Sequence, residues 1–203
     1  MTSRTLFVTR LYEAALGGSI GLNDELEDAC RMLETEDRAG RAWAKEHAYK
    51  GYTSYASLDD LPRRASAFAD LKKRLDKHAA AFAKELHLDL GGRRLALDSL
   101  WVNVLKPGGA HSGHIHPHSV LSGSYYVTVA PGASRIRFED PRLAMMMASP
   151  PRAADAPQED RQFVYVEPRP GQVLLWEAWL RHEVPANASK ADRISISFNY
   201  AWR

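Results

Sequence analysis

The stretch GGAHSGHIHPHSVLSGSYYV, residues 108–127, places four of the chain's eight histidines within eight positions and then runs into a segment rich in β-forming residues. The four are His111, His114, His116 and His118. Alternate residues of a strand point to the same face, so His114 with His116, or His116 with His118, could reach one ion together. The spacing indicates a metal site beside a β-strand.

The sequence around this stretch, from residue 95 onward, favours strands. Short runs rich in Val, Ile, Tyr and Phe are separated by Pro and Gly, and no pattern of helical length interrupts them. The runs cover residues 96–106, 121–130, 134–140, 162–168, 171–180 and 193–202. Several short strands with turns between them are typical of a sandwich or open barrel of the jelly-roll type.

The sequence before residue 95 favours helices. After a short β-like run at residues 5–12, we expect a helix capped by Asn23 that continues to about Ala48. A second helix is expected from Ser66 to a point before Gly91. Each has one apolar face that must be buried, and the following sheet is the natural partner. We therefore expect an α+β protein with one domain, residues 1–203, in which helices of residues 1–94 pack on the outer sheet of a β core at 95–203.

One long segment fits neither pattern. Residues 143–161 are poor in β-forming residues, contain three prolines and a run of three methionines, and are too long for a simple hairpin. Loops of this length are often functional or disordered. We expect this loop to be mobile and to be able to form a lid over the metal.

Composition narrows the class of protein. The chain has 203 residues, 45% hydrophobic and 26% charged, with 27 basic side chains against 25 acidic ones, so nothing suggests nucleic-acid binding. The first residues contain scattered arginines and read neither as a signal peptide nor as a membrane span. Cys30 is the single cysteine, which fits a reducing cytoplasm. Oligomeric state is not indicated.

Two further residues stand out downstream of the histidine stretch. His182 lies at the end of the apolar run at 171–180, a good position for a third metal ligand at the mouth of a barrel. Alternation in RISISFN puts Arg193 on the polar face of its strand. A buried arginine there needs an anionic partner, which is either a bound ligand or a carboxylate on a neighbouring strand.

These motifs together carry a resemblance. HIHPHSVLSGSYYV, FEDPR and RISISFN resemble a bacterial and phage family of iron(II)- and 2-oxoglutarate-dependent oxygenases related to the prolyl hydroxylases. The motifs lie between residues 101 and 199, and the N-terminal half agrees only in general character. The resemblance implies a double-stranded β-helix core, of jelly-roll or cupin-like type.

The resemblance also implies roles for individual residues. The implied ligands of iron(II), the catalytic metal, are His114, His116 and His182. The implied contacts of the cosubstrate 2-oxoglutarate are Arg193 and Ser195 to its far carboxylate, Tyr126 on the YYV strand, and Asn103 as a further pocket residue. The implied reaction is hydroxylation of a C–H bond of a small-molecule or peptide substrate, coupled to decarboxylation of 2-oxoglutarate to succinate.

One departure from the usual pattern leaves alternatives open. The common facial triad has two histidines and one carboxylate, whereas this chain offers His-x-His. A three-histidine dioxygenase of the cupin type, or a zinc hydrolase, could use the same ligands without 2-oxoglutarate. A non-catalytic barrel that binds a metal or a small molecule is the third alternative. The metal that the protein holds would separate them.

Overall fold

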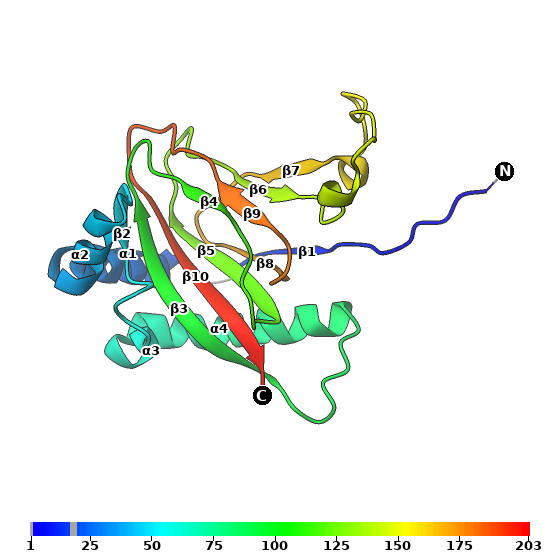
Figure 1. The fold of residues 1–203 in the computed structure, drawn as a ribbon. Coiled ribbons are helices and arrows are strands. Elements are labelled where there is room, and N and C mark those ends of the chain that lie inside the picture. Colours follow the sequence, from blue (N-terminus) through cyan, green and yellow to red (C-terminus); the bar gives the residue numbers. More distant parts are fainter. Residues whose placement is uncertain (1, 17–19) are drawn as a thin grey trace.

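Two antiparallel sheets face each other, and helices cover the outer side of the larger sheet (Figure 1). The computed structural model describes residues 2–16 and 20–203. The helices are α1 (Ile20–Glu36), α2 (Arg38–Glu46), α3 (Leu61–Arg64) and α4 (Ser66–Glu85), with two short 3₁₀ turns, η1 (Leu143–Met145) and η2 (Gln158–Asp160). None of the described helices is both long and apolar enough to cross a membrane.

The strand order gives the double-stranded β-helix that the motifs imply. The larger sheet has the order β1-β8-β5-β10-β3-β2 and the smaller one β4-β9-β6-β7. In chain order the strands are β1 (Leu11–Ala15), β2 (Gly51–Thr53), β3 (Leu95–Leu105), β4 (His111–His114), β5 (Leu121–Thr128), β6 (Ile136–Glu139), β7 (Phe163–Val166), β8 (Gln172–Glu177), β9 (His182–Val184) and β10 (Arg193–Trp202). All six strand runs expected after residue 95 are present.

The first helix differs from the expectation at both ends. Asn23 was expected as its cap, but it lies inside α1, where its side chain donates to the Val127 carbonyl at 2.8 Å and accepts from the Tyr125 hydroxyl at 2.9 Å. It ties α1 to β5 instead. The helix also stops short of Ala48, because Asp37 accepts from the Gly40 amide at 3.0 Å and starts α2 as a separate helix.

The helix α4 begins at Ser66 and ends before Gly91, as predicted. Its end is a Schellman turn, in which the amide of Leu88 donates to the carbonyl of Ala83 at 3.0 Å. His87 takes the left-handed position of that turn, with a φ of 55°. The buried face of α4 packs against the larger sheet and lies on the far side from the histidines.

Four strand positions were predicted wrongly or missed. The N-terminal strand is Leu11–Ala15, paired with β8, and not the run at 5–12. The apolar run at 171–180 ends as a strand at Glu177, and a turn precedes His182, which begins β9 in the other sheet. The short strands β2 and β4 were not expected, because β2 has three residues and β4, His-Ser-Gly-His, contains none of the usual β-forming residues.

The alternation predicted for β10 is confirmed. Ile194, Ile196 and Phe198 are fully buried against the helices. Arg193 and Ser195 lie on the opposite face, toward the smaller sheet, where a second apolar cluster fills part of the barrel. That cluster contains Leu105, Tyr126, Ile136, Phe138, Val166, Leu174, Trp176, Leu180 and Val184.

Gly123 on β5 lets the Phe198 ring lie directly on the strand, and its replacement by Ala should be destabilising. A Cβ there would come 2.5 Å from the Phe198 ring and 2.6 Å from the Leu174 carbonyl oxygen. We expect a loss of about 1–3 kcal/mol in urea unfolding. The matched control is Gly21→Ala, in α1 with open space around it, which should be neutral or stabilising. Equal effects of the two changes would contradict this packing account.

The loop at 143–161 leaves the β core at the side of β6 and β7 (Figure 1). Met145 and Met147 are 74% and 95% exposed, so they are not packed into the barrel wall. Arg142, just before the loop, forms an ion pair with Asp140 at 2.8 Å. Mobility of the loop stays a prediction.

Candidate metal centre

Three of the predicted ligands converge inside the barrel. His114 ends β4 and pairs in register with His182, the first residue of β9, while His116 follows two residues later. One ligand atom from each lies within 4.8 Å of the others, and the Nε2 atoms of His116 and His182 are 3.3 Å apart. His118 is exposed, has a φ of 69°, and is not part of this group.

Hydrogen bonds from the other ring nitrogens orient two of these imidazoles. Nδ1–H of His182 donates to the Leu180 carbonyl at 2.9 Å, and Nδ1–H of His114 donates to the Ser112 carbonyl at 2.6 Å. A carbonyl can only accept, so each ring carries its proton on Nδ1 and presents the lone pair of Nε2. Both rings can therefore offer Nε2 to a cation held by this group of histidines.

Burial keeps two of the rings neutral. It lowers the pKa of His182 to about 3 and that of His116 to about 4, and in both cases the neighbouring His114 lowers the pKa further. His182 lies against Trp176, with the ring centres 4.7 Å apart, and the His116 ring lies 5.9 Å from Trp101. A neutral imidazole is the form that binds a metal, so these two side chains are ready to bind at neutral pH.

The same lowered pKa values predict how the metal-free protein responds to acid. An unfolded histidine titrates near pH 6.5, so acid protonates the unfolded chain before the buried rings. The contribution of these two histidines to the free energy of unfolding is therefore fully present above about pH 6.5. It is lost as the pH falls toward the folded pKa of about 3 to 4. Urea unfolding should give a lower free energy at about pH 5 than at pH 7, and His182→Gln should reduce the difference. If the wild type and His182→Gln lose the same free energy of unfolding between pH 7 and pH 5, His182 is not a source of this pH dependence.

The donor set contains no carboxylate. Among the described residues, the one group able to hold a metal consists of these three histidines. Glu139 on β6 pairs with Arg181 at 3.4 Å, and Glu183 on β9 pairs with Arg137 at 3.0 Å. Three imidazole donors suit iron, zinc, copper and nickel.

Arg193 lies deeper in the barrel and lacks an anionic partner. Its side chain is only 2% exposed, yet no described carboxylate forms an ion pair with it, and its Nε has no hydrogen-bond acceptor among the described residues. Its guanidinium lies 4.9 Å from the Tyr126 ring centre and donates a long bond of 3.4 Å to the Ser195 hydroxyl. An unpaired buried charge is costly, so a bound anion would stabilise Arg193 at this position.

The other predicted pocket residues surround Arg193. Ser195 pairs in register with both Tyr126 and Asn103 on the flanking strands. The Tyr126 hydroxyl is buried without a hydrogen-bond partner among residues 2–16 and 20–203, and burial raises its pKa. The Asn103 amide is engaged, because it accepts from Thr53 at 2.9 Å and donates to Ser197 at 3.1 Å. The side-chain amide of Asn103 is therefore already hydrogen-bonded within the protein.

Sequence reasoning missed two neighbours of this site. The Tyr49 hydroxyl lies 2.9 Å from Nε2 of His111, and the charge of Arg193 acts on both side chains. Burial lowers the pKa of His111 to about 3, so this fourth histidine is also neutral. Tyr49 follows α2 at a position with no strand pattern, and no sequence signal links it to His111.

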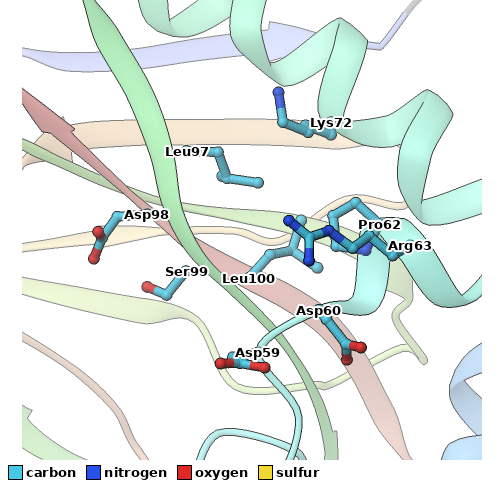
Figure 2. Close-up of a pocket in the computed structure, with 9 residues that line it drawn as sticks. All are labelled: Asp59, Asp60, Pro62, Arg63, Lys72, Leu97, Asp98, Ser99 and Leu100. Atoms are coloured by element: carbon cyan, nitrogen blue, oxygen red, sulfur yellow. The ribbon is translucent and has the colours of Figure 1, made fainter. Parts of the chain in front are cut away.

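A separate hollow lies between β3 and the helices α3 and α4 (Figure 2). It holds about 310 Å³ and contains none of the residues described above. Its lining residues are Asp59, Asp60, Pro62, Arg63, Lys72, Leu97, Asp98, Ser99 and Leu100. Charged side chains of both signs meet there, and no single ligand chemistry follows.

Comparison with known proteins agrees with this architecture. A family model described as "Putative 2OG-Fe(II) oxygenase" matches residues 99–199, about half of the chain, which include every histidine and cosubstrate residue predicted. No curated protein matches the chain.

Solved structures share the fold at low sequence identity. The alpha ketoglutarate dependent epimerase SnoN from nogalamycin biosynthesis is 17% identical, with a TM-score of 0.65 over 95% of this chain and 78% of that one. A Pseudomonas putida prolyl-4-hydroxylase is 15% identical, with a TM-score of 0.61 over 96% and 94%. HygX from Streptomyces hygroscopicus, solved with nickel and 2-oxoglutarate bound, is 16% identical, with a TM-score of 0.61 over 95% and 82%. At these identities the likeness shows the fold alone.

Proposed function

The chain belongs to the family of 2OG-Fe(II) oxygenases, and from that premise we propose that His114, His116 and His182 hold its iron(II) while Arg193 binds its 2-oxoglutarate. The protein is thus an enzyme that uses iron(II) and 2-oxoglutarate. We propose that it hydroxylates a C–H bond of a small molecule or of an amino-acid side chain. We also propose that residues 1–203 form one domain in the cytoplasm.

The observation that carries the proposal is the unpaired guanidinium of Arg193. A dicarboxylate that chelates the metal at one end would offer a second carboxylate deeper in the barrel. Arg193 can hold a carboxylate through two parallel charge-assisted hydrogen bonds, and the Tyr126 and Ser195 hydroxyls lie beside it as further donors. HygX and SnoN have also been solved with 2-oxoglutarate, or alpha ketoglutarate, bound, which supports the same occupant here.

The chain's own residues have three tasks in this reaction. When bound, iron(II) and 2-oxoglutarate would supply the oxidation, in which the substrate C–H bond, oxygen and 2-oxoglutarate give the hydroxylated substrate, succinate and carbon dioxide. The histidines fix the metal through oriented Nε2 atoms. Arg193 orients the cosubstrate. The apolar residues between the sheets, such as Phe138 and Leu174, keep water away from the reacting end.

The donor set also supports a second candidate function. Three histidines without a carboxylate are the observation that favours a dioxygenase of the cupin type or a zinc hydrolase, neither of which needs 2-oxoglutarate. A binding protein without catalysis would need no particular metal. The identity of the metal and its effect on 2-oxoglutarate binding separate these functions.

The experiment is an oxygen-free titration of the purified protein. We expect one iron(II) per chain, and 2-oxoglutarate binding that requires the metal, measured by calorimetry. Protein that holds zinc so firmly that iron cannot replace it would favour the hydrolase. Iron binding without 2-oxoglutarate binding would favour the three-histidine dioxygenase, and the absence of any bound metal would favour the binding protein.

A further inference from the structure

Trp176 carries a buried polar group that the proposed function does not use. It lies on β8 with its side chain inside the barrel and is 1% exposed. Its ring packs against His182, at 4.7 Å between centres, and against Phe138, at 5.2 Å. The indole N–H has no hydrogen-bond acceptor among the described residues.

Packing alone does not account for an indole at this position. A phenylalanine would supply an aromatic ring without a buried N–H, whereas a buried donor without an acceptor costs free energy. The buried side-chain atoms that lack a partner in the described chain are three: Trp176 Nε1, Tyr126 Oη and Arg193 Nε. All three side chains lie on the barrel-facing side of the larger sheet.

The sheet register places these groups at opposite ends of the site. Trp176 is opposite Ser122 on β5, and Tyr126, next to Arg193, lies four residues further along the same strand. That is a backbone separation of about 13 Å. His182 is at the Trp176 end. A ligand that reaches from the metal to Arg193 would therefore have one unpaired donor at its metal end and others at its far end.

We propose that Trp176 is a cosubstrate-binding residue whose indole N–H donates to the metal-bound carboxylate of the 2-oxo acid. This inference rests on the proposed function, because it needs an oxo acid at the metal. Three histidine ligands bring no negative charge to the metal, so the carboxylate of the oxo acid is the first anion at the centre. A preformed donor beside that carboxylate binds it and fixes its orientation.

The test compares two oxo acids and two variants, with nickel(II) in place of iron(II) so that no turnover occurs. Pyruvate has the metal-binding end of 2-oxoglutarate but no far carboxylate. Trp176→Phe, which keeps an aromatic ring beside Phe138 and His182, should weaken both acids about ten- to hundredfold, the range for a hydrogen bond to a charged group. Arg193→Ala should weaken 2-oxoglutarate only. Nickel affinity should be unchanged in both variants.

The outcomes separate the two proposals. Suppose that the affinity for 2-oxoglutarate in Trp176→Phe is within twofold of the wild type, while Arg193→Ala no longer binds 2-oxoglutarate. The indole is then a packing group, and the Trp176 inference fails while the proposed function stands. The inference is also overturned if Trp176→Phe binds pyruvate as tightly as the wild type does. If neither acid binds the nickel-loaded wild type, the proposed function fails and takes this inference with it.

A second measurement needs no Trp176 variant to fold. The chain has five tryptophans, so ¹⁵N-indole labelling gives five N–H resonances. Replacing each of the other four tryptophans with Phe identifies their resonances and leaves that of Trp176 by elimination. In zinc-loaded wild-type protein, the Trp176 resonance should move downfield when either acid is added. An unmoved Trp176 resonance in protein saturated with 2-oxoglutarate would overturn the proposal.

Discussion

Replacing Arg193 with Ala should weaken 2-oxoglutarate binding by two to three powers of ten and leave iron(II) binding intact. The guanidinium is buried and has no carboxylate partner among the described residues, so its bonds are free for the cosubstrate. Two charge-assisted hydrogen bonds, each worth roughly 1.5–3 kcal/mol, account for a loss of this size at about 1.4 kcal/mol per tenfold. Calorimetric titration of the iron-loaded protein without oxygen measures it.

Two further variants make this result specific. Arg193→Lys keeps the charge but not the two-pronged geometry, so it should recover only part of the affinity. Arg142→Ala removes an arginine that is half exposed and paired with Asp140, and it should leave 2-oxoglutarate binding unchanged. Equal affinity in Arg193→Ala and the wild type would show that Arg193 is structural or contacts the substrate instead.

Replacing His182 with Ala should abolish stoichiometric iron binding. His182 supplies one of three oriented ligand atoms, and two imidazoles alone hold a divalent metal much more weakly. The measurement is iron content per chain after anaerobic loading and desalting. The ring is 5% exposed and contacts Trp176 and Phe138, so the change also leaves a cavity and should lower stability by an amount that urea unfolding reports.

The matched control is His118→Ala. His118 is the alternative partner of His116 in the sequence, yet it is exposed and lies outside the group of ligand atoms. The His118→Ala variant should retain full iron content. Retained iron in His182→Ala, or lost iron in His118→Ala, would contradict the proposed ligand set.

The sequence predicted the parts of the fold whose periodicity is long. The apolar positions of α4 and the β-forming residues of the six strands predicted after residue 95 were recognisable, and the alternation around Arg193 correctly put it opposite the apolar face of β10. The cap at Asn23 was predicted wrongly because a good capping residue is also a good tertiary hydrogen-bond partner. Its bonds to β5 cannot be read from local sequence.

The site was predictable where spacing carried the information. His114 and His116 follow from their separation along the chain, but the place of His182 depends on a turn at 178–181 that transfers the chain from β8 to the other sheet. Trp176 and Tyr49 could not be recognised as site residues. Their importance lies in a missing acceptor and in a contact with His111, which only the packed barrel reveals.

The central claim is that this three-histidine protein uses 2-oxoglutarate, and succinate formation tests it most directly. Wild-type protein is incubated with iron(II), oxygen, ascorbate and 2-oxoglutarate, and succinate is measured over time. Slow substrate-free decarboxylation suffices as a signal. We predict succinate that depends on iron and oxygen and that falls to background in Arg193→Ala at low 2-oxoglutarate. Wild-type protein that holds iron yet forms no succinate and binds no 2-oxoglutarate would contradict the account.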